Sequence, residues 1–145
     1  MSGKSFQLAI HAADHSFYEG PCHYLSIPTP EGQYGIMANH ENTIFALVPG
    51  SLYYRTEKGG AKHLAAVSYG IVKMENNQAL VLVNSCERPE DIDLSRAEQD
   101  EAEARAALQA LESQEDQEDQ REEALIEAKL LRSLSRIKVK KQQGK

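Results

Sequence analysis

Charged side chains able to bind a ligand gather at residues 87–97, which read "ERPEDIDLSRA". The carboxylates of Glu87 and Asp93 accept hydrogen bonds, and the guanidinium of Arg96 donates a planar fork of N–H groups to an anion. The same residues also suit an ordinary helix start. Asp93 is a good N-cap, and an (i, i+3) ion pair between Asp93 and Arg96 is worth roughly 0.2–0.5 kcal/mol. Two interpretations therefore remain open: these residues bind a ligand, or they only cap and stabilise the start of a helix.

The stretch that precedes this joint is predicted to be all-β. Phe6, Leu8 and Ile10 recur with the period of two that is typical of a half-buried strand. Gly59-Gly60 and Asn76-Asn77 each separate two apolar runs, and both pairs supply the backbone freedom that a tight hairpin turn needs. Short strands at intervals of roughly 8–12 residues favour a β-sandwich or a flattened barrel.

The stretch that follows Pro89 is predicted to form two helices. Residues 93–112 contain neither Gly nor Pro, and their apolar stripe consists of Leu94, Ala97, Ala104, Leu108 and Leu111. "SQEDQEDQ" (residues 113–120) has no apolar residue and is predicted to be a solvated loop or a frayed helix start. The second helix is expected from about Arg121 to Lys138, with an apolar face made by Ile126, Leu130, Leu134 and Ile137. "KVKKQQGK" is expected to be a polar tail that frays.

The predicted fold class is therefore α+β, with an N-terminal all-β sandwich over residues 1–87 and an antiparallel two-helix hairpin over residues 88–145. Charge divides the hairpin. Residues 87–123 contain fifteen acidic and four basic residues, whereas residues 124–145 contain one acidic and seven basic residues. Such segregation indicates that the two helices lie against each other or against charged partners.

Several classes of function fit the sequence poorly. The net charge of −6, a short basic tail and no aromatic residue beside it argue against nucleic-acid binding. No P-loop, GxSxG or HExxH motif occurs, so we expect no catalytic residues. His11 and His15 are placed in a strand and a turn, so we expect no metal site.

No apolar run reaches the roughly 20 residues that span a bilayer, and no signal peptide is evident, which favours the cytosol. Cys22 and Cys86 fit no metal or redox spacing and are expected to be inert.

A set of short motifs, in order, resembles the epsilon subunit of bacterial F-type ATP synthases over almost the whole chain. The motifs are Glu31-Gly32, Gly35-Ile36, His40, Pro49-Gly50, Tyr69-Gly70-Ile71 and Ile92-Asp93-Leu94-Ser95-Arg96-Ala97. The family often has prolines around the histidine, where this chain has Ala38 and Glu41-Asn42, so the loop is expected to be less rigid.

This resemblance implies a sandwich of about ten strands followed by two helices, in a non-catalytic subunit of the central rotor stalk. The sandwich would bind the gamma subunit and the membrane c-ring, with Gln33 and His40 in the contact loop. The protein would sit at the cytoplasmic face of the membrane and touch it only through the complex. In the family the second helix inhibits ATP hydrolysis by entering the catalytic alpha/beta ring. Here its basic residues are Arg132, Arg136, Lys138, Lys140 and Lys141.

The resemblance also implies a regulatory nucleotide site, because some family members bind ATP on the folded hairpin. The matching residues are Glu87, Asp93, Arg96, Arg132 and Arg136. Three guanidiniums can neutralise phosphates, but the same residues could equally serve as a helix cap and a solvated face. No cofactor is required by this hypothesis, and ATP would be a regulatory ligand. The rival hypotheses are a free-standing ATP-sensing module, with the hairpin as its nucleotide site, and a small β-sandwich enzyme or adaptor of unrelated function.

Overall fold

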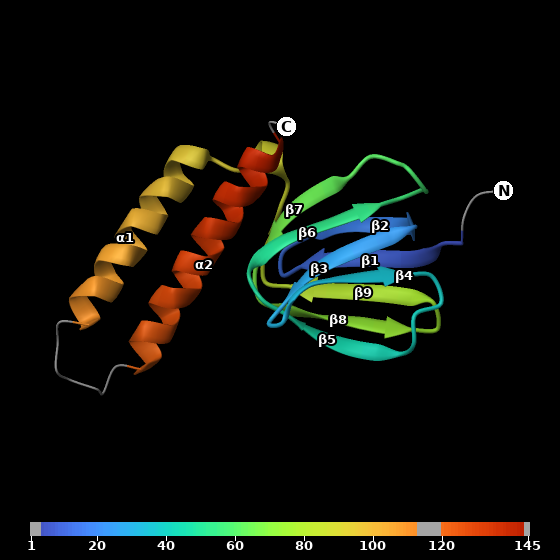
Figure 1. Ribbon diagram of the computed structural model, residues 1–145, viewed down its shortest axis with the longest axis horizontal. Helices are drawn as coiled ribbons and strands as arrows, with labels where there is room; N and C mark the ends of the chain where they lie inside the picture. Colours follow the sequence, from blue (N-terminus) through green and yellow to red (C-terminus); the bar gives the residue numbers. More distant parts are fainter. Residues whose placement is uncertain (1–3, 113–119, 144–145) are drawn as a thin grey trace.

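The computed structural model describes residues 4–112 and 120–143, which form a β-sandwich followed by two helices (Figure 1). Ten strands occur in these ranges: β1 (Phe6–Ala12), β2 (Ser16–Cys22), β3 (Tyr24–Thr29), β4 (Gly32–Met37), β5 (Thr43–Leu47), β6 (Gly50–Arg55), β7 (His63–Val67), β8 (Gly70–Glu75), β9 (Gln78–Val83) and β10 (Cys86–Glu87). One sheet has the order β2-β1-β9-β8-β5 and the other β10-β7-β6-β3-β4. The predicted α+β class, with about ten strands before a helical hairpin, is confirmed.

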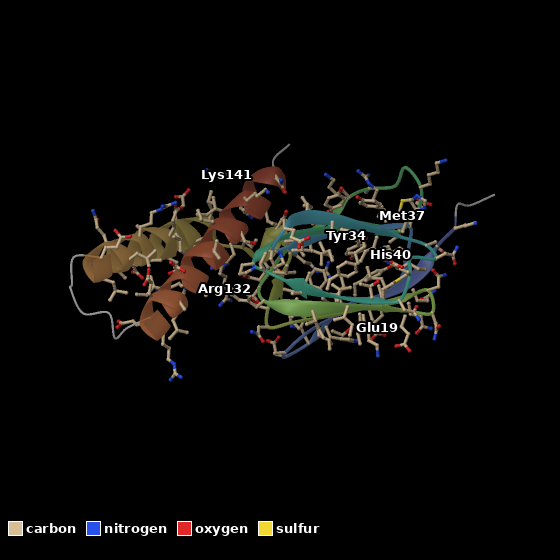
Figure 2. The ribbon with its side chains drawn as sticks, turned by 60° about the horizontal axis from the view of Figure 1, so that its bottom comes forward. Glu19, Tyr34, Met37, His40, Arg132 and Lys141 are labelled. Atoms are coloured by element: carbon tan, nitrogen blue, oxygen red, sulfur yellow. The ribbon has the colours of Figure 1, made fainter. Side chains whose placement is uncertain are left out.

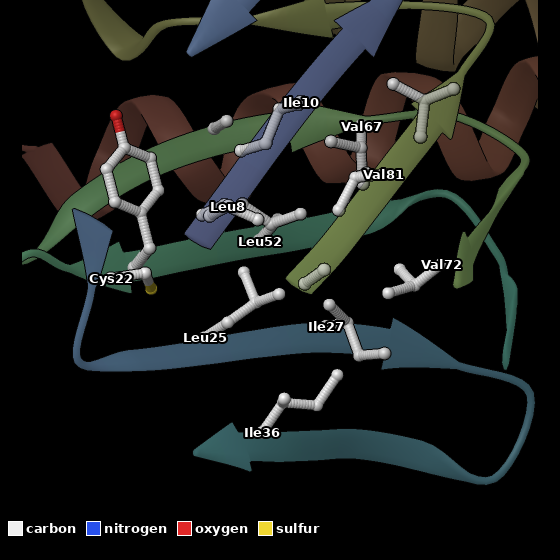
Figure 3. Packing of buried hydrophobic residues seen from close by; sticks show 14 of the residues in the cluster. Leu8, Ile10, Cys22, Leu25, Ile27, Ile36, Leu52, Val67, Val72 and Val81 are labelled. Atoms are coloured by element: carbon white, nitrogen blue, oxygen red, sulfur yellow. The ribbon is translucent and has the colours of Figure 1, made fainter. Parts of the chain in front are cut away.

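The core lies between the two sheets and explains why the alternating sequence pattern forms strands. Phe6, Leu8 and Ile10 point inward from β1 and are almost completely buried. Opposite them, Leu25 and Leu52 come from β3 and β6 of the second sheet (Figure 3). Burying each such side chain stabilises the fold by about 1.5–3 kcal/mol, so the sandwich has a core of its own.

Turn geometry agrees with the residue types at the hairpins. Asn76 and Asn77 have φ of 51° and 61°, the left-handed values that asparagine tolerates better than most residues. Gly70 opens β8 so close to β9 that a Cβ atom there would collide with the carbonyl oxygen of Leu82. Only glycine therefore fits at position 70.

The helices begin where the sequence predicts. A short 3-10 turn, η1 (Pro89–Asp91), leads from β10 to α1 (Leu94–Glu112). The amide of Arg96 donates to Asp93 Oδ1 at 3.2 Å, so Asp93 is the N-cap. The helix α2 (Gln120–Gln143) lies alongside α1, and α2 rather than α1 makes the extensive contact with β6 and β7 (Figure 1). Residues 113–119, predicted as a loop, lie outside the described residues.

The C-terminal end of α2 differs from the sequence prediction. We expected a fraying polar tail from Lys138, but the helix continues to Gln143. The reason is tertiary packing, because Val139 is completely buried against Ala66 of β7 and Ile92. Lys140 Nζ also donates to the carbonyl oxygen of Pro89 at 3.0 Å. One apolar residue in a polar segment thus fixes the last turns of the helix to the sandwich.

Candidate functional site

A polar cavity of about 360 Å³ lies between the two helices, near the sandwich. Its lining is Arg96 and Asp100 from α1, with Lys129, Arg132, Ser133 and Arg136 from α2. Arg96 and Asp100 are four residues apart, and the α2 residues follow at spacings of three and four, so each set occupies one helix face. Four cationic side chains and one carboxylate give the cavity a net positive lining, which suits an anion.

Arg136 is the most enclosed of these cations. Its Nε lies 2.9 Å from Glu87 Oε1, its Nη2 donates to Glu87 Oε2 at 3.2 Å, and its Nη1 lies 3.8 Å from Asp100 Oδ2. The Arg136 side chain is 14% exposed and the Glu87 side chain is 24% exposed. Although Nε is close to Glu87, it is buried and no described acceptor completes a hydrogen bond to it. The guanidinium of Arg136 therefore forms an ion pair, but its Nε–H group lacks a hydrogen-bond acceptor.

The five residues predicted to bind a nucleotide differ in their position relative to this cavity. Arg96, Arg132 and Arg136 line it together, although they come from two helices. Glu87 does not line it, but pairs with Arg136 and lines a separate recess of about 490 Å³ that also includes Arg132. Asp93 lines an adjoining polar recess of about 470 Å³, which shares Arg96 with the cavity, and its side chain is used as the helix cap. The structure thus brings Arg96 of α1 together with Arg132 and Arg136 of α2. That these residues bind a nucleotide stays a prediction.

Sequence reasoning missed three lining residues: Asp100, Lys129 and Ser133. A signal for them was present, because Asp100 follows Arg96 by one helical turn and Lys129 precedes Arg132 and Ser133 by one turn. The side chain of Lys129 also reaches Glu103 on α1 at 3.4 Å. This pair and the Arg136–Asp100 contact confirm the expected attraction between the acidic first helix and the basic second helix.

The five basic residues predicted to meet the beta subunit divide into two groups in the folded hairpin. Arg136 and Lys140 are engaged with Glu87 and with the carbonyl oxygen of Pro89. Arg132, Lys138 and Lys141 are exposed, and Figure 2 shows Arg132 on the side of α2 next to the sandwich. Ser135 also attaches α2 to the sandwich, because its Oγ donates to the carbonyl oxygen of Gly50 at 2.7 Å.

His40, predicted to lie in a contact loop, is half-buried and belongs to an aromatic cluster of the sandwich. Its Nε2 lies 2.8 Å from the Tyr34 hydroxyl, and its Nδ1 lies 2.9 Å from the carbonyl oxygen of Glu41. The rings of Tyr34 and His40 also pack on Phe45. Figure 2 shows His40 and Tyr34 away from the helices. The half-exposed Met37 follows Tyr34 by three residues on β4, so its side chain points to the other face of the strand, as that of Gln33 does.

Gln33, the other predicted contact residue, does not share this cluster. Its Nε2 donates to the carbonyl oxygen of Ser51 at 2.7 Å. Gln33 and Tyr34 are neighbours on β4, so their side chains point to opposite faces of the strand. The two predicted residues therefore lie on different surfaces, and Tyr34 rather than Gln33 is the partner of His40.

Asparagines hold the His40 loop where the family often has prolines. The amide of Asn39 donates to Asn77 Oδ1 at 2.7 Å, and the amide of Asn76 donates to Asn42 Oδ1 at 3.0 Å. Asn77 Nδ2 then donates to the carbonyl oxygen of Ser5. These bonds tie the loop to the β8–β9 turn and to the N-terminal end of β1. The expected loss of rigidity is offset by these hydrogen bonds.

A second exposed feature is an apolar face on the sheet that contains β5, β8 and β9. Ile44, Ile71 and Leu82 are 66%, 43% and 41% exposed. Ile71 is paired directly with Leu82 across β8 and β9, so the two side chains are neighbours. Ile44 pairs with Lys73 across β5 and β8, and is therefore a diagonal neighbour of Ile71. Exposed apolar side chains grouped in this way suit contact with a protein partner.

Other chemistry is limited within residues 4–112 and 120–143. Burial raises the pKa of both the Cys22 and Cys86 thiols to about 12, and neither cysteine is paired. No cluster of three or more His, Cys, Asp or Glu side chains is arranged to hold a metal ion there. The described helices include none with the length and apolar character to cross a membrane.

Comparison with known proteins places this architecture in a family. The sequence profile of the ATP synthase delta/epsilon chain β-sandwich domain matches residues 5–89. An ATP synthase epsilon chain from Nitratidesulfovibrio vulgaris (strain DP4) is 34% identical over 139 residues, which cover 94% of this chain and 96% of the relative. Another from Clostridium novyi (strain NT) is 35% identical over 105 residues, covering 72% and 79%.

The fold has a counterpart among solved structures. A chain in the mitochondrial ATP synthase of Euglena gracilis superimposes with a TM-score of 0.74 at 22% identity, covering 99% of this chain and 83% of that chain. That likeness supports the arrangement of a sandwich followed by a hairpin. Together, the matched β-sandwich domain and the nearly full-length bacterial relatives show that the chain belongs to the ATP synthase epsilon chain family, whose members are non-catalytic subunits of the F-type complex.

Proposed function

We propose that residues 1–87 bind the gamma subunit and the c-ring in the rotor stalk, and that residues 88–145 regulate ATP hydrolysis. The observation that carries the proposal is that α2 contacts the sandwich at β6 and β7 without entering its main core. Its hydrogen bonds, ion pair and buried valine all come from Ser135, Arg136, Val139 and Lys140. These few contacts are worth roughly 3–6 kcal/mol together. A partner of moderate affinity can displace a helix held this weakly.

The sandwich offers one surface for each rotor partner. The cluster of Tyr34, His40 and Phe45 is assigned to the c-ring, because its loop is preset by asparagine hydrogen bonds and lies away from the hairpin. The apolar face of Ile44, Ile71 and Leu82 is assigned to gamma, since a stable contact in a rotor needs apolar burial. Gln33 bonds to Ser51, so it contributes less than His40. With these partners the chain works at the cytoplasmic face of the membrane.

Release of α2 would make it a stronger ligand for acidic loops of the beta subunit. Arg132, Lys138 and Lys141 are exposed in the folded hairpin, whereas Arg136 and Lys140 are occupied. Undocking exposes all five cations on one helix. Electrostatic attraction to an acidic partner then increases, so the folded hairpin is the non-inhibitory state.

The test is ATP hydrolysis by the assembled complex containing the full chain or a chain ending at Glu87. The truncated chain should raise hydrolysis while gamma still co-purifies with it. A double change, Lys138→Ala with Lys141→Ala, should raise hydrolysis partway, and Lys58→Ala serves as a matched control on the β6–β7 loop. Unchanged hydrolysis after truncation would remove the inhibitory role, and failure to co-purify with gamma would remove the stalk role.

A regulatory ATP site on the hairpin is a second proposal, supported by the cavity between α1 and α2. Three guanidiniums and Lys129 line it, and these four cations outnumber the single carboxylate of Asp100. Binding there would link Arg96 on α1 to Arg132 on α2 and hold the hairpin closed. Calorimetry with ATP and magnesium tests the site. No heat with the wild-type chain, or equal affinity for Arg96→Ala, would remove it. If ATP bound but the chain never associated with gamma, the free-standing sensor would be the better description.

A further inference from the structure

We infer that a network of four asparagines (Asn39, Asn42, Asn76 and Asn77) positions the strand β5 so that it presents one partner surface on each of its two faces. The inference rests on the proposed function, which assigns one of these surfaces to the c-ring and the other to gamma. The asparagines belong to neither surface. Their role is to hold the two contact surfaces in a fixed relation to each other.

The strand β5 takes part in both surfaces. Ile44 and Phe45 are neighbours on this strand, so their side chains point to opposite faces. Ile44 belongs to the apolar face that includes Ile71. The ring of Phe45 packs on the ring of Tyr34, with 4.7 Å between their centroids, in the cluster that contains His40. A movement of β5 would therefore change both surfaces at once.

The position of β5 needs support because the strand lies at the edge of its sheet. Among the described strands, β5 forms a ladder with β8 on one side and with none on the other. An edge strand leaves half of its backbone groups unpaired, so its position depends strongly on what holds its ends. At the C-terminal end, the amide of Val48 donates to the carbonyl oxygen of Pro28 at 3.1 Å.

The asparagine network holds the N-terminal end of β5. The amide of Asn76 donates to Asn42 Oδ1 at 3.0 Å, which fixes the residue just before the strand. The amide of Asn39 donates to Asn77 Oδ1 at 2.7 Å, and Asn77 Nδ2 donates to the carbonyl oxygen of Ser5 at 3.0 Å. With both of its polar atoms, the Asn77 side chain therefore connects the loop before β5 to the residue before β1.

Two of the asparagines belong to the β8–β9 turn and allow a clean substitution. Asn76 and Asn77 have φ of 51° and 61°, which glycine adopts without strain. Asn77→Gly removes the side chain that bonds to Asn39 and Ser5, while the turn can keep its backbone conformation. Asn76→Gly keeps the amide that donates to Asn42, and the Asn76 side chain has no hydrogen-bond partner among the described residues. Asn76→Gly is therefore the matched control.

The experiment measures the affinity of the full chain for the purified gamma subunit by calorimetry. The variants are Asn77→Gly, its control Asn76→Gly, and a pair at position 42. Asn42→Ala removes the acceptor for the Asn76 amide, and Asn42→Asp supplies an oxygen at the same place. Unfolding in urea checks that each variant remains folded under the conditions of the titration.

Nuclear magnetic resonance of the free chain reports on the two faces of β5 separately. The ring resonances of Tyr34 and Phe45 report on the aromatic cluster, and the methyl resonances of Ile44 and Ile71 report on the apolar face. Asn77→Gly should shift both sets, although the hydrogen bonds of the Asn77 side chain go only to Asn39 and Ser5. Asn76→Gly should shift neither set appreciably.

We expect Asn77→Gly to weaken gamma binding about tenfold. Loss of two hydrogen bonds lowers the population of chains with β5 in the binding position, and the apparent Kd rises in proportion. Asn42→Ala, which loses one hydrogen bond, should weaken binding about three- to fivefold. Asn76→Gly and Asn42→Asp should both remain within about twofold of wild type.

Three results would overturn the positioning role while the stalk function survives. The first is equal gamma affinity for Asn77→Gly and Asn76→Gly. The second is a change in the resonances of one face only, because β5 would then not act as a unit. The third is equal loss of affinity in Asn42→Ala and Asn42→Asp, because the hydrogen bond would then not be the cause. If the wild-type chain does not bind gamma, the proposed function fails and the inference fails with it.

Discussion

Shortening Val139 to alanine should release the end of α2 while leaving the sandwich folded. Val139 is completely buried, and its partners Ala66 and Ile92 belong to a small cluster separate from the main core. The substitution removes two methyl groups at about 0.8 kcal/mol each, and the cavity left behind brings the loss to about 1.5–3 kcal/mol. That loss lowers the ratio of docked to undocked helix by roughly ten- to a hundredfold.

Hydrogen exchange of backbone amides in the full chain measures this ratio segment by segment. Protection in residues 133–143 should fall by at least about tenfold, whereas β1 and β9 should keep their protection because the main core is untouched. Leu125→Ala is the matched control, since Leu125 lies on the same helix and is 67% exposed. If Val139→Ala changes α2 protection no more than Leu125→Ala does, the valine does not hold the helix. A parallel loss of protection in β1 would show instead that the two clusters unfold as one unit.

Two further predictions concern the helix start and the thiols. Asp93→Ala should destabilise α1 by about 1 kcal/mol in urea unfolding followed by far-UV circular dichroism, and Asp93→Asn should not, because asparagine caps equally well; equal loss in both would mean that the charge, not the cap, matters. Cys22 and Cys86 have native pKa values of about 12, above the roughly 8.5 expected when unfolded, so their contribution to stability is complete below pH 8.5 and is lost as pH rises towards 12. Thiol reagents at pH 8 should therefore label the native chain far more slowly than the urea-unfolded chain, and rapid native labelling would contradict the burial.

The strands of the sandwich could be predicted because the alternation of apolar and polar residues is a local pattern that recurs from strand to strand. The alternation of Phe6, Leu8 and Ile10 specifies which face of β1 is buried, whatever the strand pairs with. The pairing was not predictable to the same degree. β1 lies parallel to β9, which is more than sixty residues later, and no short-range turn encodes that contact. The end of α2 was mispredicted for a related reason, because one buried valine outweighed a polar composition that favours fraying.

The candidate site was predictable at the level of helix faces and no further. Helical spacing puts Arg132 with Arg136 and Arg96 with Asp100, so each half of the cavity can be read from the chain. The contact between Glu87 and Arg136 spans 49 positions and depends on how α2 docks against β6 and β7. Sequence reasoning therefore names the correct cations but cannot assign Glu87 a partner.

That docking contact determines what the hairpin can regulate. Among the residues that the structure describes, the main core includes none from α2, so undocking leaves the core of the sandwich in place. Undocking also exposes Arg136 and Lys140, which adds positive charge to the helix that would meet the beta subunit. The same step breaks the ion pair between Glu87 and Arg136 and returns Glu87 to solvent. An acidic protein surface would therefore compete with Glu87 for Arg136, and it could bind this side chain only after the ion pair with Glu87 is broken.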